Sequence, residues 1–247
     1  MLFLREKFLD PYHTGSLAWK LRRKRFAIFK QWLDQFPRPL NILDVGGTPS
    51  FWQTMNFENP RDIHITLLNL EAYPINSPMF TSLAGDATDL SRFKNHEFDI
   101  VFSNSVIEHV GDDWQQWKMA HEIARVGKAY FVQTPNIMFP IEAHFYFPFF
   151  QFMPLYARAF LLYYFDLTGG GIQRTMHAWK TRLRFQKFQR GPQESWERCM
   201  ERVKAVRLLG KAKFRKFFPE GQLYKEKSFG LTKSYIVFTN PQSRVTS

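Results

Sequence analysis

Residues 41–50 read NILDVGGTPS, an apolar run that ends in an acid, two glycines and three small or turn-forming residues. The apolar half predicts a short buried strand. A glycine pair after a strand lets the backbone turn sharply and approach a ligand closely, and small residues behind it allow a helix to follow. We therefore expect strand, turn and helix here, with Gly46 and Gly47 in the turn. The same pattern also suits a tight turn that binds no ligand.

Further apolar runs predict strands at residues 64–70, 98–103 and 128–133. Segments with room for a helix or a loop separate them, and such alternation is typical of a parallel sheet covered by helices on both faces. Two more strand patterns, at residues 223–228 and 234–239, flank a turn at Gly230. We expect an α/β fold.

Polar residues follow these strands, where ligands of parallel sheets bind. Asn69 and Glu71 come a little over 20 residues after the glycine turn, a spacing that suits hydrogen bonds to ribose hydroxyls. Asp86, in the sequence Gly-Asp-Ala, stands where a carboxylate could bond an adenine amine. Ser103 and Asn104 end the next strand. Four such features in order point to a ligand site.

With these motifs in this order, the sequence resembles the class I S-adenosylmethionine-dependent methyltransferases, and within them a bacterial type 11-like group. Residues 98–110, FDIVFSNSVIEHV, resemble the fourth motif of that group. Residues 44–47 (DVGG), 85–87 (GDA) and 131–136 (FVQTPN) extend the likeness, and residues 229–235 resemble its paired last strands more loosely.

The resemblance implies a single Rossmann-like domain over residues 1–247. It would have a seven-stranded, mostly parallel sheet, helices on both faces, and antiparallel last strands. Its parts would be an N-terminal basic helical arm (1–40), a cofactor-binding core (41–136), an inserted aromatic and basic helical cap (137–220) and the final strand pair (221–247).

The resemblance also implies S-adenosylmethionine as the cofactor and assigns its contacts. The amino acid part would contact Asp44, Gly46 and Gly47, the ribose Glu71 or Asn69, and the adenine Asp86 with Ala87. Ser103 and Asn104 would lie beside the sulfonium. Thr48 and Ser50 replace two glycines of the family's Asp-x-Gly-x-Gly-x-Gly motif. This departure keeps open a noncatalytic binding module that retains the fold without the cofactor.

Methyl transfer needs an aligned nucleophile and, for a hydroxyl nucleophile, a base; it requires no metal, so none is expected. His109 and His144 are candidate catalytic bases because histidine titrates near neutral pH, and Glu108 and Glu142 are candidate groups that orient them. A histidine at a helix start can equally be a cap or a packing residue. The predicted reaction is methylation, at oxygen, of a small-molecule or lipid-linked glycan acceptor.

The chain carries a formal charge of +12, and 17% of its residues are aromatic. Such a surplus favours an anionic partner. Apolar residues at helical spacing predict a helix from Ser16, a possible N-cap, to Phe36, before Pro37. Its basic residues form either a solvated face or an arm that touches phosphates or lipid headgroups; they are Lys20, Arg22, Arg23, Lys24 and Arg25.

Residues 137–165 are strongly aromatic, and residues 174–217 hold 14 lysines and arginines against three glutamates. Pro148, Gln151, Pro154 and Arg158 interrupt the aromatic stretch, which argues against a transmembrane helix. A region with an aromatic half and a basic half suits the binding of an amphiphile with an anionic head. We expect residues 145–165 to pack as a cap and also to meet an anionic membrane surface; the alternative is that they simply bury against the sheet.

Methylases of nucleic acid bases commonly carry an Asn-Pro-Pro-aromatic turn after the fourth strand, and Ser103-Asn104-Ser105-Val106 is not such a turn. Nucleic acid is therefore disfavoured as a partner, although RNA methylation by another geometry stays open. The single cysteine, Cys199, excludes an internal disulfide and a multi-cysteine zinc site. Because residues 1–7 do not form a signal peptide pattern, we expect a cytoplasmic protein, with peripheral contact at the inner membrane face as the alternative.

Overall fold

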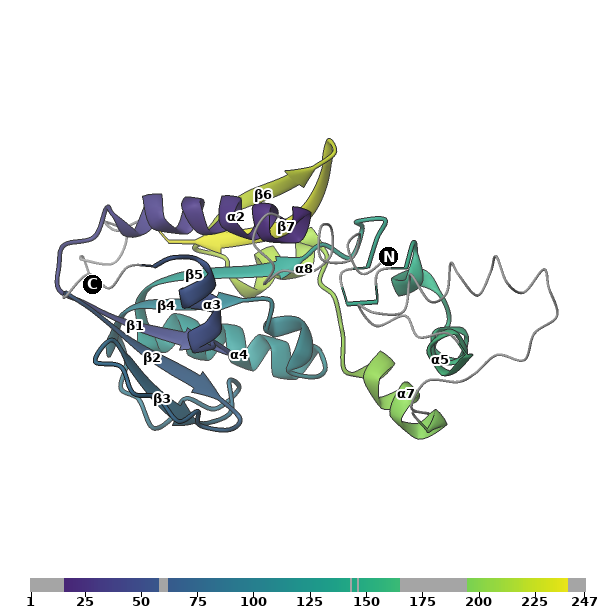
Figure 1. Cartoon of the computed structure of the whole chain (residues 1–247), viewed down its shortest axis with the longest axis horizontal. Helices are drawn as coiled ribbons and strands as arrows, with labels where there is room; N and C mark the ends of the chain where they lie inside the picture. The colour runs from purple at the N-terminus through teal and green to yellow at the C-terminus, as the bar shows by residue number, and fades with distance from the viewer. Residues whose placement is uncertain (1–15, 58–61, 143, 146, 165–194, 240–247) are drawn as a thin grey trace. The chain divides into compact units, whose positions relative to one another are not determined.

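The computed structural model describes residues 16–57, 62–142, 144–145, 147–164 and 195–239 (Figure 1). The chain divides into two compact units. The sheet unit comprises Arg25–Asn136 and Arg207–Ser247, and the second unit comprises Met1–Lys24 and Ile137–Val206.

The sheet unit contains seven strands in the order β3-β2-β1-β4-β5-β7-β6, which confirms the predicted α/β fold (Figure 1). β1 to β5 run parallel, while β7 is antiparallel to both β5 and β6. The carboxyl ends of the five parallel strands therefore share one edge. The strands are β1 (Leu40–Val45), β2 (Ile63–Asn69), β3 (Phe80–Ala84), β4 (Phe98–Asn104), β5 (Gly127–Pro135), β6 (Gln222–Ser228) and β7 (Leu231–Phe238).

Helices cover both faces of the sheet, as predicted. On one face, Val101 of β4 shares a buried cluster with Ile123 of α4 (Asp113–Val126) and with Phe214 of α8 (Lys211–Phe217). On the other face, α2 (Leu17–Leu33) and α3 (Pro49–Thr54) supply aromatic rings. Phe29 of α2 contacts Phe102 of β4, with ring centroids 4.6 Å apart. Neighbouring strand residues thus serve opposite faces, as the two-residue strand period requires.

Local capping fixes where these helices begin. The Ser16 side chain accepts a hydrogen bond from the backbone N–H of Trp19, at 2.9 Å, so Ser16 caps α2 as the sequence predicts. α2 ends at Leu33, three residues before the predicted end. Asp112 and Gln115 form a capping box at the start of α4.

The second unit contains α5 (Leu155–Tyr164) and α7 (Trp196–Lys204), preceded by a short 3₁₀ turn, η2 (Phe150–Phe152). Ala159 and Leu162 of α5 share a buried cluster with Cys199 and Val203 of α7. Among the described helices, none combines the length and the apolar character that a bilayer crossing requires. Much of the basic segment, residues 174–194, lies outside the described residues.

The second compact unit ends within the region 137–220, which is expected from the sequence to form a cap. The division falls between Val206 and Arg207. α8 follows that point, and its buried Phe214 belongs to the cluster under the sheet. The apolar spacing of Phe214 and Phe218 among basic residues explains how α8 joins the core while exposing its charges.

Phe29 offers a test of how far the helix–sheet contact stabilises the fold. Its side chain is fully buried against Phe102 and Phe131. Phe29→Ala should lower the free energy of unfolding by about 3–5 kcal/mol, because it removes buried area and leaves a cavity. Denaturant unfolding measures this. The exposed neighbour serves as control: Lys30→Ala should stay within about 0.5 kcal/mol of the parent, and equal losses in both variants would contradict the packing.

Candidate cofactor site

The turn after β1 is built so that only glycine fits at two successive positions. Gly46 has φ +78°, a conformation that side chains disfavour, and a Cβ there would lie 2.4 Å from a methyl of Val106. A Cβ on Gly47 would lie 1.9 Å from a carboxylate oxygen of Asp44. The backbone N–H of Gly46 donates to the carbonyl of Leu68 in β2, at 2.8 Å. The turn is therefore bare backbone held at the carboxyl edge of the sheet.

The Asp44 carboxyl group lies beneath this turn, and its residue is only 1% exposed. The indole N–H of Trp52 in α3 donates to its Oδ2 at 2.7 Å. Burial raises the pKa of Asp44 to about 7, although the hydrogen bond from Trp52 pulls it down. Asp44 thus braces the turn from below.

Asn69 and Thr48 also brace the turn. The Asn69 side-chain amide, at the end of β2, donates to the Gly47 carbonyl. Thr48 caps α3, accepting a hydrogen bond from the Phe51 N–H at 3.3 Å, and its hydroxyl lies 3.0 Å from that of Ser50. The two residues that replace family glycines therefore start the helix after the turn, which explains the hydroxyl side chain at position 48.

Two acidic side chains follow the outer strands at the same edge. Glu71 is exposed just after β2, and Asp86 is exposed two residues after β3. The backbone N–H and the hydroxyl of Thr88 both donate to Oδ1 of Asp86, at 2.8 and 2.9 Å, and so fix its carboxylate. Ala87 beside it is half-buried. Both carboxylates can accept hydrogen bonds from a ligand over this edge.

The end of β4 is polar and locally strained. Ser103 is buried, and its hydroxyl donates to the Val45 carbonyl at 3.1 Å, across the point where the strand order reverses. Ser105 has φ +59°. Its N–H and its hydroxyl donate to Gln133 of β5, at 3.0 and 2.7 Å, and these bonds hold the unusual backbone. Half-buried Asn104 stands between the two serines.

Arg25 connects α2 to this edge, which corrects the expectation of a solvated basic face at this position. One guanidinium nitrogen donates to Asn104 at 2.9 Å and to Gln133 at 3.0 Å. The Nε donates to buried Glu226 at 3.1 Å, and Ser234 donates to the same carboxylate oxygen. Burial raises the pKa of Glu226, but the charges of Arg25 and Lys233 and the hydrogen bonds from Ser234 and Arg25 together outweigh it, so the pKa is lowered overall.

Sequence reasoning missed Arg25, Gln133 and Glu226 as parts of this network because their partners are distant in sequence. Arg25 is 79 positions from Asn104 and 201 from Glu226. No local pattern contains such a pair. The one available signal was an arginine next to Phe26, a buried residue of the helix.

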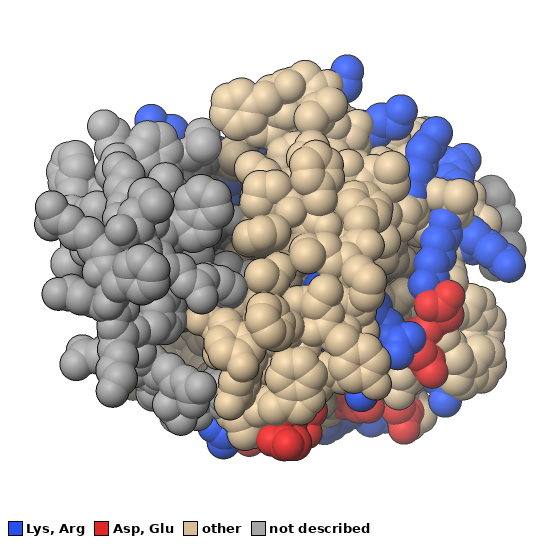
Figure 2. Space-filling view, turned by 90° about the vertical axis from the view of Figure 1, so that its right-hand side faces the viewer, with Lys and Arg blue, Asp and Glu red and all other residues tan. Residues whose placement is uncertain are grey.

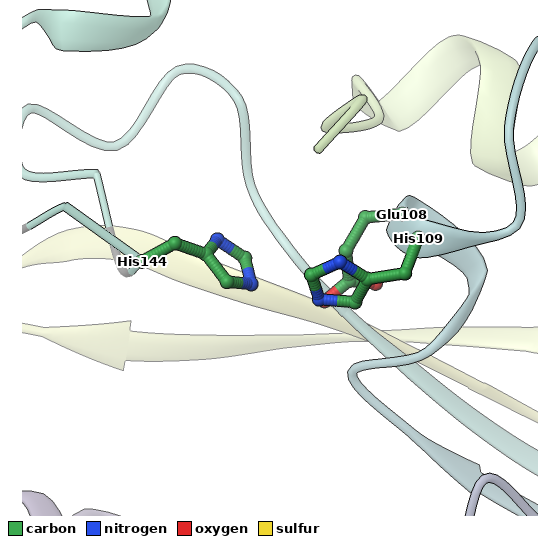
Figure 3. A group of neighbouring side chains, drawn as sticks. All are labelled: Glu108, His109 and His144. Atoms are coloured by element: carbon green, nitrogen blue, oxygen red, sulfur yellow. The ribbon is translucent and has the colours of Figure 1, made fainter. Parts of the chain in front are cut away.

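Glu108 and His109 lie in a 3₁₀ turn, η1 (Ile107–His109), just beyond β4 (Figure 3). Glu108 is fully buried, and the Thr134 hydroxyl of β5 donates to its Oε2 at 3.0 Å. The Arg207 N–H donates to the Glu108 carbonyl at 2.8 Å. His109, in contrast, is exposed. The turn therefore anchors through Glu108 and leaves His109 accessible.

His144, also drawn in Figure 3, belongs to the second unit and has its own carboxylate. Its Nδ1 lies 2.7 Å from Oε1 of Glu142, which is buried. The backbone N–H groups of His144 and Phe145 both donate to the other oxygen of Glu142, at 2.7 Å. The carboxylate is thus fixed by the backbone and orients the imidazole, the pairing that the sequence suggested.

Comparisons with known proteins agree with this architecture. Residues 54–130 match the family model described as "Methyltransferase domain". The solved structure of the CurJ carbon methyltransferase is similar at 13% identity and TM-score 0.52, over 92% of this chain and 55% of that one. The CMeT domain of the citrinin polyketide synthase is similar at 13% identity and TM-score 0.51, over 97% and 56%.

Magnesium protoporphyrin IX methyltransferase from Synechocystis PCC 6803, solved with bound S-adenosylhomocysteine (SAH), gives 12% identity and TM-score 0.47, over 88% and 82%. No curated protein matches the sequence. The chain spans little more than half the length of the CurJ and citrinin synthase structures.

The fold is that of the S-adenosylmethionine-dependent methyltransferases, which confirms the resemblance seen in the sequence. The matched domain implies S-adenosylmethionine as the cofactor. At this level of identity, the structural likeness itself establishes the fold and not the acceptor.

Asp44 predicts a pH dependence of stability. Its pKa is about 7 in the folded chain and 3.8 in the unfolded chain, so between these values the folded state holds a proton that the unfolded state has released. This group's contribution to stability is therefore complete below pH 3.8 and is lost as the pH rises through 7. The whole change is on the order of 4 kcal/mol.

Denaturant unfolding between pH 5 and pH 8 measures this effect in the parent and in Asp44→Asn, which cannot titrate at this position. The parent should lose stability relative to Asp44→Asn as the pH rises. Parallel pH profiles for the two proteins would contradict the burial of Asp44.

Proposed function

We propose that this chain transfers a methyl group from S-adenosylmethionine to an oxygen of a small-molecule or lipid-linked glycan acceptor. The observation that carries the proposal is the bare backbone turn at Gly46 and Gly47, beside the point where the strand order reverses. Ligands of open α/β sheets bind at such points.

The residues at this edge fit the cofactor. A Cβ at Gly46 would collide with Val106, and one at Gly47 would collide with Asp44. Because both positions carry no side chain, the turn can offer its backbone to the amino acid part of the cofactor. The exposed carboxylate of Glu71 can accept hydrogen bonds from ribose hydroxyls, and that of Asp86 from the adenine amine. Asp44 and Asn69 act on this site through the turn that they brace. The bound cofactor supplies the electrophilic methyl group.

His109 is the first candidate base for the acceptor hydroxyl. Its imidazole is exposed at the end of β4, and the buried Glu108 side chain fixes the turn that carries it. His144 is the second candidate, because the Glu142 carboxylate at 2.7 Å would stabilise an imidazolium after proton uptake. Either would take the proton at an imidazole nitrogen.

The exposed apolar side chains of the second unit support the proposed acceptor class and a peripheral membrane contact. In its aromatic stretch Phe145, Phe150 and Leu162 are buried, whereas seven other large apolar side chains are exposed. The face drawn in Figure 2 carries a broad area without charged side chains. Neither charged residue of this stretch, Glu142 or Arg158, is exposed. A surface of this kind suits an amphiphile or a bilayer interface. The exposed residues are Met138, Ile141, Phe149, Phe152, Tyr156, Phe160 and Tyr164.

Calorimetry with S-adenosylmethionine and SAH tests the proposal. We expect binding of both. The absence of binding at millimolar concentration would contradict the enzyme and favour the alternative, a noncatalytic module with this fold. RNA methylation, the remaining alternative, would require methyl incorporation into RNA.

Asp86 tests the adenine contact. Asp86→Ala should weaken cofactor binding by roughly 1–3 kcal/mol, because it removes a charged hydrogen-bond acceptor. Asp89→Ala is the matched control: Asp89 lies in the same loop, is exposed, and accepts a hydrogen bond from the Ser91 backbone. Unchanged affinity in a folded Asp86→Ala protein, or equal losses in both variants, would place the adenine elsewhere.

His109 tests the assignment of the base. The acceptor is first sought among copurifying metabolites and lipids by mass spectrometry, and transfer is followed with a labelled methyl group. His109→Ala should lower kcat at least about a hundredfold and leave cofactor affinity unchanged. His121→Ala, an exposed histidine on α4, is the control. A loss confined to His144→Ala would transfer the role to His144, and parallel losses of turnover and affinity would make His109 structural.

A further inference from the structure

The hairpin of β6 and β7 presents a phenylalanine where such turns favour asparagine or glycine. Its two-residue turn is Phe229-Gly230, with φ +51° and +79°. Two positive φ values are typical of the type I′ turn, in which the first position prefers Asn, Asp or Gly because a bulky side chain is strained there. At 86%, Phe229 is also the most exposed large apolar side chain among the described residues.

The turn projects into open space. A Cβ built on Gly230 would have no atom of the described residues within 4 Å, and Figure 1 shows the yellow hairpin extending beyond the other strands. Leu231, beside Phe229 in the turn region, is 52% exposed. The strained backbone thus leaves Phe229 almost fully exposed and Leu231 about half exposed at the tip of the hairpin.

The strands behind this tip carry lysines and no accessible acid. Lys225 and Lys227 of β6 are exposed. Glu226, the single acid between residues 222 and 233, is buried and paired with Arg25. The outer surface of the hairpin is therefore positive behind an apolar tip.

We propose that the tip of the β6–β7 hairpin inserts into the interface of an anionic phospholipid bilayer. At about 3.3 Å per strand residue, Lys227 lies about 7 Å and Lys225 about 13 Å from the tip. Interfacial segments bury their apolar side chains about 5–10 Å deep. The lysines would therefore reach the level of the anionic headgroups while Phe229 and Leu231 enter the acyl boundary.

A bilayer suits this surface better than a folded partner or a nucleic acid. Because no described residue lies within 4 Å of a Cβ built on Gly230, the part of the chain that the structure describes offers at this tip neither a pocket for a partner's side chain nor a groove that follows a phosphate backbone. A fluid interface adapts to a projecting tip. This contact belongs to the sheet unit, so it depends neither on the aromatic surface of the second unit nor on the proposed reaction.

Phe229→Asn separates membrane binding from folding, because asparagine is favoured in this turn. The experiment measures cosedimentation of the full chain with vesicles of phosphatidylcholine and phosphatidylglycerol (7:3) and of phosphatidylcholine alone. Phe229→Asn should keep or raise the melting temperature, retain cofactor affinity and lower the partition coefficient at least fivefold. Trp114→Asn, an exposed aromatic residue of α4 outside both proposed membrane surfaces, is the control for general loss of an aromatic side chain.

Charge is tested in the same assay. Lys225→Gln with Lys227→Gln should lower binding to the anionic vesicles about tenfold or more and leave binding to neutral vesicles unchanged. Lys30→Gln with Lys94→Gln, two other exposed lysines of the sheet unit, should have a smaller effect. Equal losses in the two lysine pairs would overturn a specific role of the hairpin.

Direct insertion can be read at the tip itself, because Cys199 is buried and leaves an introduced thiol as the reactive one. An environment-sensitive dye on Phe229→Cys should shift to shorter wavelength with anionic vesicles. An unshifted dye, unchanged partitioning of Phe229→Asn, or no vesicle binding by the parent would each overturn the proposal. Binding of single-stranded RNA that Phe229→Asn abolishes would overturn it in favour of nucleic acid.

Discussion

The site depends on one constraint: backbone must pass directly over a buried carboxyl group. Asp44 lies beneath the turn, Trp52 donates to it from α3, and Gly47 leaves no room for a side chain above it. Asn69 then ties the turn to β2. These contacts join β1, β2 and α3 at the carboxyl edge, so that the strand, the turn and the helix form as one piece. The raised pKa of Asp44 is the electrostatic cost of this arrangement.

The Arg25 network sets the other half of the same edge. It joins the first helix to the ends of β4 and β5 and to the hairpin, elements far apart in sequence. Buried ion pairs contribute little net stability but disfavour alternative arrangements, because either partner alone would be left as an uncompensated charge. We infer that the network fixes Asn104 and the strained Ser105 in one geometry. Glu226 contributes to the network from the buried side of β6, while Lys225 and Lys227 are exposed.

Much of the sheet could be predicted because its strands are continuous apolar runs, and β1, β2, β4 and β5 fall within two residues of the expected positions. β3 could not be placed, since only Phe80 of its five residues is buried and the strand has no apolar run. The site motifs were visible as polar residues after strands. The way these residues act could not be read from the sequence. Asp44 and Asn69 brace the turn through contacts with Trp52 and Gly47, and Arg25 acts through contacts with residues far away in the sequence.

If the bare turn after β1 receives an adenosyl cofactor, a crystal structure of the chain with SAH will show it. We expect ligand density along Gly46 and Gly47, with the ribose at Glu71 and the adenine at Asp86. Density at another edge of the sheet, or side chains filling the space above the turn in the presence of saturating ligand, would contradict it.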